Sequence, residues 1–286
     1  MTARVYFLHA LSPLHAGTGQ GVGVIDLPIA REKATGIPYL PGSSVKGVLR
    51  DAMQMQNKNG AVTKLFGPDT TNAAEHAGAA QFADARLLLL PIRSLRGIFA
   101  WITSPYLLRR FARDARESGL TPPSQIPAPT ERQQALVSGT AIVFEHNKER
   151  LVVLEDLDLK ASESSDAKNW ASWLGQQAAI DEATQRLCIV HDDVLSFLLQ
   201  TATEVVARIR LQDNTKTVAQ GALWYEEALP AESLLYGVIV TQTINSYKAD
   251  QAIADLQVFD QKIFQFGGNA TVGRGMCQFR FAGGAQ

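Results

Sequence analysis

The sequence contains only two cysteines, Cys188 and Cys277, in 286 residues. Cysteines this few and this far apart form neither a disulfide framework nor the paired spacing of a zinc site. Their scarcity excludes the small disulfide-rich secreted class of protein. A reducing compartment is therefore expected, and the cytoplasm is the default.

Long apolar runs are missing as well. None approaches the ~20 residues that a membrane-spanning helix requires. The N-terminal residues 1–13 lack the charged segment, long apolar core and small-residue cleavage site of a signal peptide. Both absences predict a cytoplasmic protein that makes no membrane contact.

An excess of either charge is also absent, because 27 lysines and arginines balance 28 acids and leave a net charge of −1. No global basic field attracts a polyanion, so any nucleic-acid binding must rest on local segments. One such segment, residues 205–218, has three cations against one acid: Arg208, Arg210, Lys216 and Asp213. Another, residues 264–286, has two arginines and no acid. The length allows one large domain or two ordinary ones.

Glycine is abundant in residues 11–50, which we interpret as the working part of the chain. Four glycines alternate there, Gly17, Gly19, Gly21 and Gly23, and one carboxylate, Asp26, follows in an apolar run. Glycine at this density leaves the backbone uncovered and permits positive φ, which suits a loop pressed against a ligand. The segment predicts an exposed acidic loop.

A helix start follows this loop at residues 41–44, Pro-Gly-Ser-Ser. Ser43 and Ser44 are candidates for the N-cap, and Lys46 and Arg50 fall on one face of the first turns. A helix N-terminus with free N–H groups, a hydroxyl and a lysine is suited to an anion. We therefore predict a phosphate site beside the acidic loop.

The remaining pattern predicts an α+β fold. Strands are expected at residues 3–11, 85–93, 97–103, 140–144, 150–160, 234–243 and 276–281. Helices are expected at residues 43–56, 106–118, 166–177, 192–201 and 246–264. Residues 57–80 are expected to be an insertion with little helix. This order predicts a ferredoxin-like (RRM-like) palm, an antiparallel sheet with helices on one face, interrupted by large insertions.

Residues 204–227 have the pattern of a long β-hairpin. Arg208 and Arg210 alternate with apolar residues at period two, and Asp213-Asn214 suits the turn. The returning arm ends in two pairs, Trp224-Tyr225 and Glu226-Glu227. Such a hairpin could project and touch an anionic polymer, or it could be an edge hairpin whose charges block aggregation.

Two charged motifs have simpler interpretations than binding. Four arginines at helical spacing favour a solvated helix face over a binding stripe: Arg109, Arg110, Arg113 and Arg116. The tripeptide His191-Asp192-Asp193 resembles a metal-site sequence, but an acid-rich helix N-cap explains it better.

The loop at residues 266–275 imitates the spacing of a phosphate-binding P-loop. The imitation fails because Arg274 occupies the lysine position, Gly275 occupies the hydroxyl position, and a strand-like segment follows. The first glycine loop fails as a dinucleotide fingerprint, since no helix opens after it. The two glycine loops could still meet in the fold and cradle one phosphate backbone, with Arg274 as a fixed charge.

Five segments together resemble the RAMP superfamily of CRISPR proteins. They are SPLHAGTG (12–19), IDLPIARE (25–32), IPYLPGSSVKGVLR (37–50), ALWYEEALP (222–230) and FGGNATVGRG (266–275). Within that superfamily the resemblance is to the backbone subunits of type III-B (Cmr) effector complexes. The segments cover both ends of the chain and the hairpin, and nothing diagnostic lies between residues 60 and 160.

The resemblance implies a single RAMP domain over residues 1–286. Its insertions would be 57–84 (lid- or fingers-like), 104–185 (mixed) and 204–227, where the hairpin resembles the family's thumb. Several copies would associate into a helical filament along a guide CRISPR RNA, with other subunits of the Cmr effector complex, in antiviral defence. The thumb would press on the guide–target duplex and displace a base at regular intervals. The RNA-binding residues implied are Ser43, Ser44, Lys46, Arg50, Arg208, Arg210, Lys216, Gly268, Asn269, Thr271, Gly273 and Arg274.

The family cleaves target RNA at each displaced nucleotide. The residue carried over for this is Asp26, with His15, Glu227 and Tyr225 as neighbours. A splayed nucleotide permits in-line attack by its 2′-OH, which an A-form helix forbids. Asp26 could accept the 2′-OH proton or bind a divalent cation, Mg²⁺ or Mn²⁺, and the metal role is favoured because a lone exposed carboxylate is a weak base at neutral pH.

Three alternatives stay open at the level of sequence. His15 could protonate the leaving oxygen or only hold the glycine loop. The chain could be a non-catalytic RNA-binding scaffold while another subunit cuts. It could also be a guide-RNA-processing endoribonuclease with His15 as general base, which needs no metal.

Overall fold

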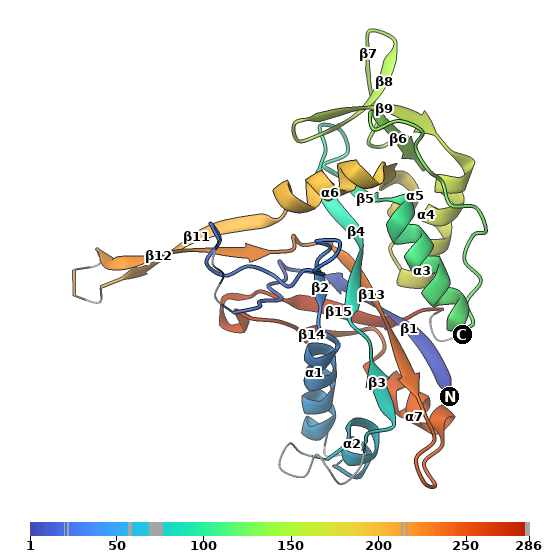
Figure 1. The fold of residues 1–286 in the computed structure, drawn as a ribbon, viewed down its shortest axis with the longest axis vertical. Coiled ribbons are helices and arrows are strands. Elements are labelled where there is room, and N and C mark those ends of the chain that lie inside the picture. The colour runs from blue at the N-terminus through green and yellow to red at the C-terminus, as the bar shows by residue number, and fades with distance from the viewer. Residues whose placement is uncertain are drawn as a thin grey trace.

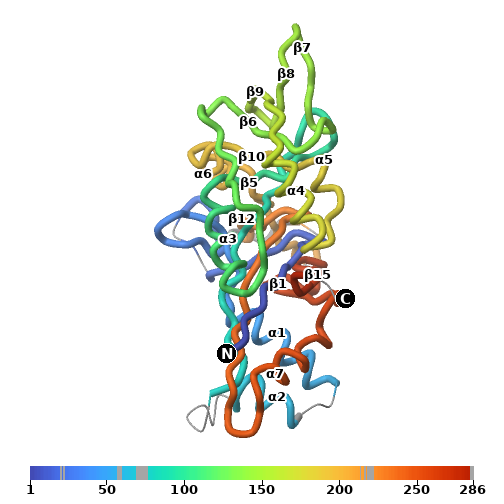
Figure 2. Tube along the Cα trace, turned by 90° about the vertical axis from the view of Figure 1, so that its right-hand side faces the viewer, coloured from blue at the N-terminus to red at the C-terminus, as the bar shows by residue number. Residues whose placement is uncertain are grey.

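The computed structural model describes residues 1–19, 21, 23–56, 59–68, 77–212, 214–215 and 217–283. The body is elongated, and a two-stranded hairpin projects from its side (Figure 1). A view turned by 90° shows that the body is narrow in the other direction (Figure 2). None of the helices in the described ranges has the length and apolar character needed to cross a bilayer.

The sheet is organised around β1 (Thr2–Ala10), which pairs antiparallel with β13 (Leu234–Thr241) and β15 (Met276–Phe281). On the outer sides, β13 pairs with β4 (Ala85–Arg93) and β15 with β14 (Lys262–Gln265), again antiparallel. Two short strands, β2 (Tyr39–Leu40) and β3 (Ala80–Phe82), pair with β4 and β13.

Beyond β4 the same sheet continues through β5 and β10 into four strands, β6 to β9, that fall within the predicted insertion at 104–185. The order is β5 (Phe99–Thr103), β10 (Leu187–Val190), β6 (Gln134–Val137), β9 (Leu157–Glu163), β8 (Glu149–Leu154) and β7 (Phe144–His146). The pairs β5–β10 and β6–β9 are parallel. The described residues thus form a curled, open, mixed α/β structure in which the strands of the body belong to one sheet.

Apolar clusters lie on both faces of the sheet because alternate residues of β1 point to opposite sides. Tyr6 and Leu8 pack with α1 (Gly42–Met55) and α7 (Ala249–Leu256). Val5 and Phe7 pack with α3 (Pro105–Glu117) and α4 (Ser165–Ala178). The shorter helices are α2 (Asn59–Phe66), α5 (Ala183–Arg186), α6 (Asp192–Thr201), η2 (Gln257–Phe259) and η3 (Ala270–Val272).

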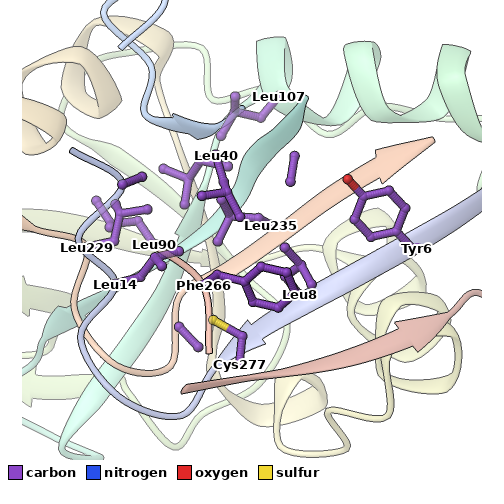
Figure 3. Packing of buried hydrophobic residues seen from close by; sticks show 14 of the residues in the cluster. Tyr6, Leu8, Leu14, Leu40, Leu90, Leu107, Leu229, Leu235, Phe266 and Cys277 are labelled. Carbon is purple, nitrogen blue, oxygen red and sulfur yellow. The ribbon is translucent and has the colours of Figure 1, made fainter. Parts of the chain in front are cut away.

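The first cluster reaches the base of the hairpin (Figure 3). Leu14 and Leu229 are both buried in it, and their backbones exchange hydrogen bonds of 2.8 and 2.9 Å. Cys277 lies in the same cluster, and burial raises the pKa of the Cys188 and Cys277 thiols to about 12. Both thiols therefore stay protonated and act as core residues.

The hairpin is confirmed as β11 (Glu204–Leu211) and β12 (Val218–Ala228), which form a separate antiparallel sheet. Its register places Val205, Ala207 and Ile209 opposite Glu227, Tyr225 and Leu223. Several large apolar side chains on it are exposed: Val205, Ile209, Leu211, Leu223 and Tyr225. These side chains lie outside the buried core, because the hairpin projects away from the body (Figure 1).

Several predicted elements have the expected bounds, and others are wrong. The strand at 85–93 and the helix at 192–201 match β4 and α6. The strand expected at 150–160 is broken by a turn in which Glu155 has φ 47°. The helix expected at 246–264 ends at η2, because Gln261 adopts φ 58° and β14 follows.

The strand expected at 140–144 is also wrong, since β7 begins only at Phe144. Helix α2 occupies part of 57–80, a region expected to contain little helix; residues 57–58 and 69–76 lie outside the described ranges. Strands β6 and β10 were not predicted, because both are four residues long and fully or half buried. Runs this short show no usable period.

Candidate functional site

Asp26 lies at the base of the hairpin, on a segment that runs beside β12. Leu27 N–H donates to the Tyr225 carbonyl at 3.0 Å, and Glu227 N–H donates to the Leu27 carbonyl at 3.0 Å. Asp26 is exposed, and its Oδ2 accepts a hydrogen bond of 2.8 Å from Tyr225 N–H. The structure therefore brings Asp26 and Tyr225 together through Oδ2 of the carboxylate. We call residues 23–29 the carboxylate loop.

Glu227 is a buried hub for this loop, with 3% of its surface exposed. Its carboxylate accepts hydrogen bonds from Ile29 N–H at 3.1 Å, Arg31 Nη2 at 2.5 Å and Thr203 Oγ1 at 2.8 Å. These partners come from the carboxylate loop, the segment that follows it, and the entry to β11. Glu227 thus joins three segments through one ion pair and two hydrogen bonds.

His15 binds the backbone of the same residue, Glu227. Its Nδ1 is 2.6 Å from the Glu227 carbonyl oxygen, which can only accept, so this nitrogen carries the hydrogen. The ring is buried against glycine, and a Cβ added at Gly17 would lie 2.5 Å from His15 Nε2. His15 therefore fastens the first glycine loop to β12, and only Nε2 is available for a ligand.

The two glycine loops meet, as the sequence predicted. Gly268 N–H donates to the His15 carbonyl at 2.9 Å, and Gly275 N–H donates to the Pro13 carbonyl at 2.9 Å. Together with α1 they line a groove of about 510 Å³. Its walls include Gly17, Gly19, Ser44, Gly267 and Gly268. The groove therefore exposes backbone from both ends of the chain beside a helix start.

Glu226 is a second buried hub, on the other face of β12. It accepts hydrogen bonds from Trp224 Nε1 at 2.9 Å, Arg208 Nε at 3.2 Å and Asn269 Nδ2 at 3.0 Å. Burial alone would raise the pKa of the Glu226 carboxyl, but the hydrogen bonds from Trp224 and Arg208 outweigh it, so the pKa lies below its usual value. Glu226 is therefore ionised and links the hairpin to the C-terminal glycine loop.

The predicted RNA-binding cations differ in how far they are available. Arg208 is paired with Glu226, and Arg274 is 9% exposed with its Nη1 3.6 Å from Glu204 Oε2. Arg210 is exposed on the hairpin, as are Thr271 and Gly273 at the tip of the C-terminal loop. Lys216 lies outside the described residues.

The start of α1 differs from the prediction. The helix begins at Gly42 with Pro41 at the N-cap and no side-chain cap, so the expectation that Ser43 or Ser44 caps it is wrong. Both serines lie inside the first turn, and Gly42 N–H donates instead to Asp84 Oδ1 at 2.8 Å. A Cβ at Gly42 would be 2.3 Å from the Phe82 carbonyl, so the helix start is packed tightly against β3.

Lys46 and Ser44 face different grooves. Ser43 and Lys46 line a groove of about 330 Å³ with residues of α2 and β3, whereas Ser44 lines the groove shared with the glycine loops. Arg50 extends the Lys46 face and donates to the Pro68 carbonyl at 3.2 Å. The predicted phosphate site is therefore divided between two faces of α1.

The arginines of α3 are not uniformly solvated. Arg110 has 13% of its side chain exposed and pairs with Glu32, just beyond the carboxylate loop, so the expectation of a solvated face is wrong for this residue. Arg109 pairs with Asp192 and is half exposed. His191 occupies the N-cap of α6, where its Nδ1 accepts from Asp193 N–H at 3.2 Å, which confirms the capping interpretation.

Within the described residues, no group of three or more His, Cys, Asp or Glu side chains is arranged to bind a metal ion. Asp26 can supply one carboxylate oxygen, because the other accepts from Tyr225 N–H. Mg²⁺ is often bound through one or two carboxylates together with substrate phosphates and water. The site fits a divalent cation that is shared with a phosphate, and does not form an all-protein metal site.

Sequence reasoning missed Glu226, Arg31 and Thr203. The signal for Glu226 was present, since period two on β12 puts Glu226 and Glu227 on opposite faces, each near a different glycine loop. No local pattern marked Arg31 or Thr203. Their contacts with Glu227 span 196 and 24 residues of sequence.

Comparisons with known proteins match most of the chain. The sequence model of the RAMP superfamily covers residues 7–278. The chain is 38% identical to the "CRISPR system Cmr endoribonuclease Cmr4" of Pyrococcus furiosus over 287 residues, 96% of this chain and 94% of that protein.

Two solved structures are similar in fold. The crystal structure of oligomeric Cmr4 from Pyrococcus furiosus has a TM-score of 0.79 and 28% sequence identity, covering 98% of each chain. A chain in the cryo-EM structure of the Type III-B Cmr-beta bound to cognate target RNA has a TM-score of 0.77 and 21% identity, covering 98% of this chain and 97% of that one, which is a likeness of fold.

Proposed function

The chain belongs to the RAMP superfamily, and we propose that it is an RNA-guided endoribonuclease subunit of a type III-B (Cmr) CRISPR effector complex. In this role it associates with further copies of itself and with other Cmr subunits along a guide CRISPR RNA. It cleaves a paired target RNA at displaced nucleotides, in antiviral defence. The support for self-association is the likeness to oligomeric Cmr4, and the support for cleavage is the relative named an endoribonuclease.

The observation that carries the proposal is the position of Asp26 at the base of a projecting hairpin. Its carboxylate is exposed and is tied to the hairpin strand through Tyr225 N–H. A hairpin inserted into a duplex displaces a nucleotide where it enters. An acid fixed to that hairpin then lies beside the displaced nucleotide rather than beside the regular helix.

In this proposal the fold consists of a palm, a thumb and two further insertions. Strands β15, β1, β13 and β4 are neighbours in an antiparallel arrangement, and α1 and α7 connect them on one face, which supports a ferredoxin-like palm. The β11–β12 hairpin serves as the thumb. The chain is one RAMP domain over residues 1–286, with insertions at 57–84 and 104–185 in addition to the thumb at 204–227.

Guide RNA is held by backbone and shape in this proposal, since base pairing reads the sequence. The groove between the glycine loops offers main-chain N–H groups, the Ser44 hydroxyl and His15 Nε2 to phosphates. Lys46 supplies a charge on the neighbouring face of α1, and Arg210, Thr271 and Gly273 are exposed for further contacts. Asn269 and Arg274 act here by holding the C-terminal glycine loop against the hairpin, and Arg208 acts by pairing with Glu226 across the hairpin.

Cleavage requires the 2′-OH of the displaced nucleotide to lie in line with the scissile phosphate. Asp26 orients this hydroxyl with its free oxygen and can accept its proton. A divalent cation bound there by Asp26 and RNA phosphate would offset the charge that develops on the phosphate. His15 Nε2 is a further group that could transfer a proton in this proposal, while Tyr225 holds Asp26 through its backbone and Glu227 holds the loop.

The proposal is tested with the assembled complex, loaded with a guide and given a complementary target labelled at one end. We expect cuts at regular intervals within the paired region, and none in a target without complementarity. A complex that binds the target and leaves it intact would favour the non-catalytic scaffold. Cleavage of the guide precursor alone, insensitive to a chelator, would favour guide processing.

Lys46→Ala is expected to weaken guide binding for every sequence. Each single-strand phosphate contact contributes about 0.7 to the slope of log K against log salt, so the slope should flatten by about that amount. Lys168→Ala provides the control, because Lys168 is an exposed lysine of α4, on the other face of the sheet. An unchanged slope for Lys46→Ala would exclude this contact.

A further inference from the structure

We propose that Arg31, acting through Glu227, is a positioning residue for Asp26 that fixes the carboxylate loop to the hairpin base. The inference rests on the proposed function, because it concerns how the same site is held. Arg31 and Glu227 form an ion pair with 25% and 4% of their side chains exposed. Neither residue is placed in contact with RNA in this proposal.

The geometry of Glu227 distinguishes it from a catalytic group. Both carboxylate oxygens are occupied, one by Ile29 N–H and the other by Arg31 and Thr203. Only 3% of the residue is exposed, so little of its surface is open to a target phosphate. Its contacts with protein account for its burial and its charge, since a buried carboxylate requires a partner cation and satisfied hydrogen bonds.

Arg31 likewise binds groups of the protein itself. One guanidinium nitrogen, Nη1, donates to the Gly36 carbonyl at 2.9 Å, and Nη2 donates to Glu227 Oε1 at 2.5 Å. The first bond closes the turn that follows the carboxylate loop, and the second fastens that turn to β12. A lysine could not make both contacts at once, because it lacks the planar fork of the guanidinium.

Together these contacts hold the chain at Asp26 and directly after it. Asp26 and Leu27 bind the Tyr225 backbone, and Ile29 and Arg31 bind Glu227. Among the described residues, the Asp26 carboxylate accepts one hydrogen bond, from Tyr225 N–H. Its position relative to a displaced nucleotide is therefore set by the Arg31–Glu227 pair, and a shift of about 1 Å is enough to cost about 100-fold in rate.

Arg31 has an alternative role, direct contact with RNA, and the experiment must distinguish it from positioning. Arg31 and Glu227 line a groove of about 500 Å³ between the carboxylate loop and α6, so Arg31 could contact an RNA phosphate directly. A phosphate contact would lower target affinity and flatten its salt dependence. A positioning role lowers the cleavage rate constant and leaves affinity, salt slope and the spacing of cuts unchanged.

The test uses the assembled, guide-loaded complex and measures single-turnover cleavage at saturating target, together with target affinity. We expect Glu227→Gln to slow cleavage about 10-fold and Arg31→Gln about 100-fold, since the latter leaves a buried carboxylate without its cation. The double variant Arg31→Gln/Glu227→Gln is expected to be no slower than Arg31→Gln. Multiplied single effects would mean independent roles and would overturn the proposal.

A further experiment tests whether Glu227 influences the cleavage rate through Asp26. In an Asp26→Asn background, Glu227→Gln should leave the residual rate unchanged, because the group that it positions is already gone. A further loss there would assign Glu227 a role of its own and contradict the proposal. If instead Asp26→Asn cleaves at the wild-type rate, the proposed function has failed, irrespective of what Glu227 does.

Two variants guard against loss of folding. Thr203→Val removes one hydrogen bond to Glu227 and nearly preserves shape, and a reduction of about 3-fold in the rate constant is expected from it. Asp255→Asn removes a partly buried, hydrogen-bonded carboxylate on α7, whose partners Tyr247 and Gln251 belong neither to the hairpin nor to the carboxylate loop, and should leave cleavage unchanged. Loss of target affinity with Thr203→Val, or an unaltered rate constant with both Thr203→Val and Glu227→Gln, would overturn the proposal.

Discussion

Asp26→Asn is expected to slow target cleavage by orders of magnitude while the complex still assembles and binds its target. The amide keeps the shape of the side chain and can still accept the Tyr225 N–H, so the carboxylate loop should retain its conformation. What is lost is the negative charge and the basic oxygen. A loss of about 10²–10⁴-fold in the cleavage rate constant is expected, the range attributed to a positioned general acid or base.

The measurement is single-turnover cleavage of a labelled target by complexes that contain the wild-type or variant subunit in every copy. Asp156→Asn is the matched control, since Asp156 is an exposed acid in the β8–β9 turn. Regular cuts at an undiminished rate with Asp26→Asn would leave the chain as a scaffold that holds RNA while another subunit cuts. Cleavage that persists after chelation would remove the divalent cation from the mechanism and leave Asp26 as a proton acceptor.

Helices and strands whose bounds are set by their own residues were predictable from the sequence. β4 is an apolar run bounded by Asp84 and Arg93, and α6 starts at an acid-rich cap, so both bounds are local properties. The end of the last predicted helix is determined by residues outside that helix. Phe259 and Ile263 continue the helical spacing, but Gln261 turns the chain so that β14 can pair with β15. A strand that gains a sheet edge can override helical periodicity, because pairing supplies its hydrogen bonds.

The candidate site was predictable as a set of residues and not as an arrangement. Asp26 and Tyr225 are separated by 199 positions, and no pattern in the sequence states that they touch. Resemblance to a family supplied Asp26, His15, Tyr225 and Glu227 together. It did not distinguish the exposed Asp26 from the buried Glu227, because exposure is a property of the folded chain.

The cationic residues also show that the sequence does not reveal which side chains are paired in the fold. Arg208 and Arg274 are charged residues in basic segments, and the sequence assigned them to phosphate. In the fold each faces a glutamate across the hairpin base. A basic segment predicts an anion nearby, but that anion can be a carboxylate of the protein itself. Whether a cation stays accessible, as Arg210 does on the hairpin and Lys46 does in part on α1, depends on which face of a strand or helix it occupies.

Gly275→Ala is expected to destabilise the protein strongly and to dismantle the groove between the glycine loops. Gly275 has φ 77°, and a Cβ there would lie 1.9 Å from the Phe266 carbonyl oxygen. Gly275 N–H also binds the Pro13 carbonyl, and Gly275 O accepts from Phe266 N–H at 2.8 Å. The clash is with backbone, so the whole turn must move and both hydrogen bonds are strained or lost.

Gly273→Ala separates this clash from the cost of backbone conformation. Gly273 has φ 78°, and no atom lies within 4 Å of its added Cβ. Alanine in that conformation costs about 1–2 kcal/mol, and Gly275→Ala should lose at least about 2 kcal/mol more, since large losses follow from strain together with broken backbone hydrogen bonds. Urea unfolding of the two variants measures the difference. Equal losses would mean that the turn absorbs the clash, and the tight contact between the two glycine loops would then not be required for folding.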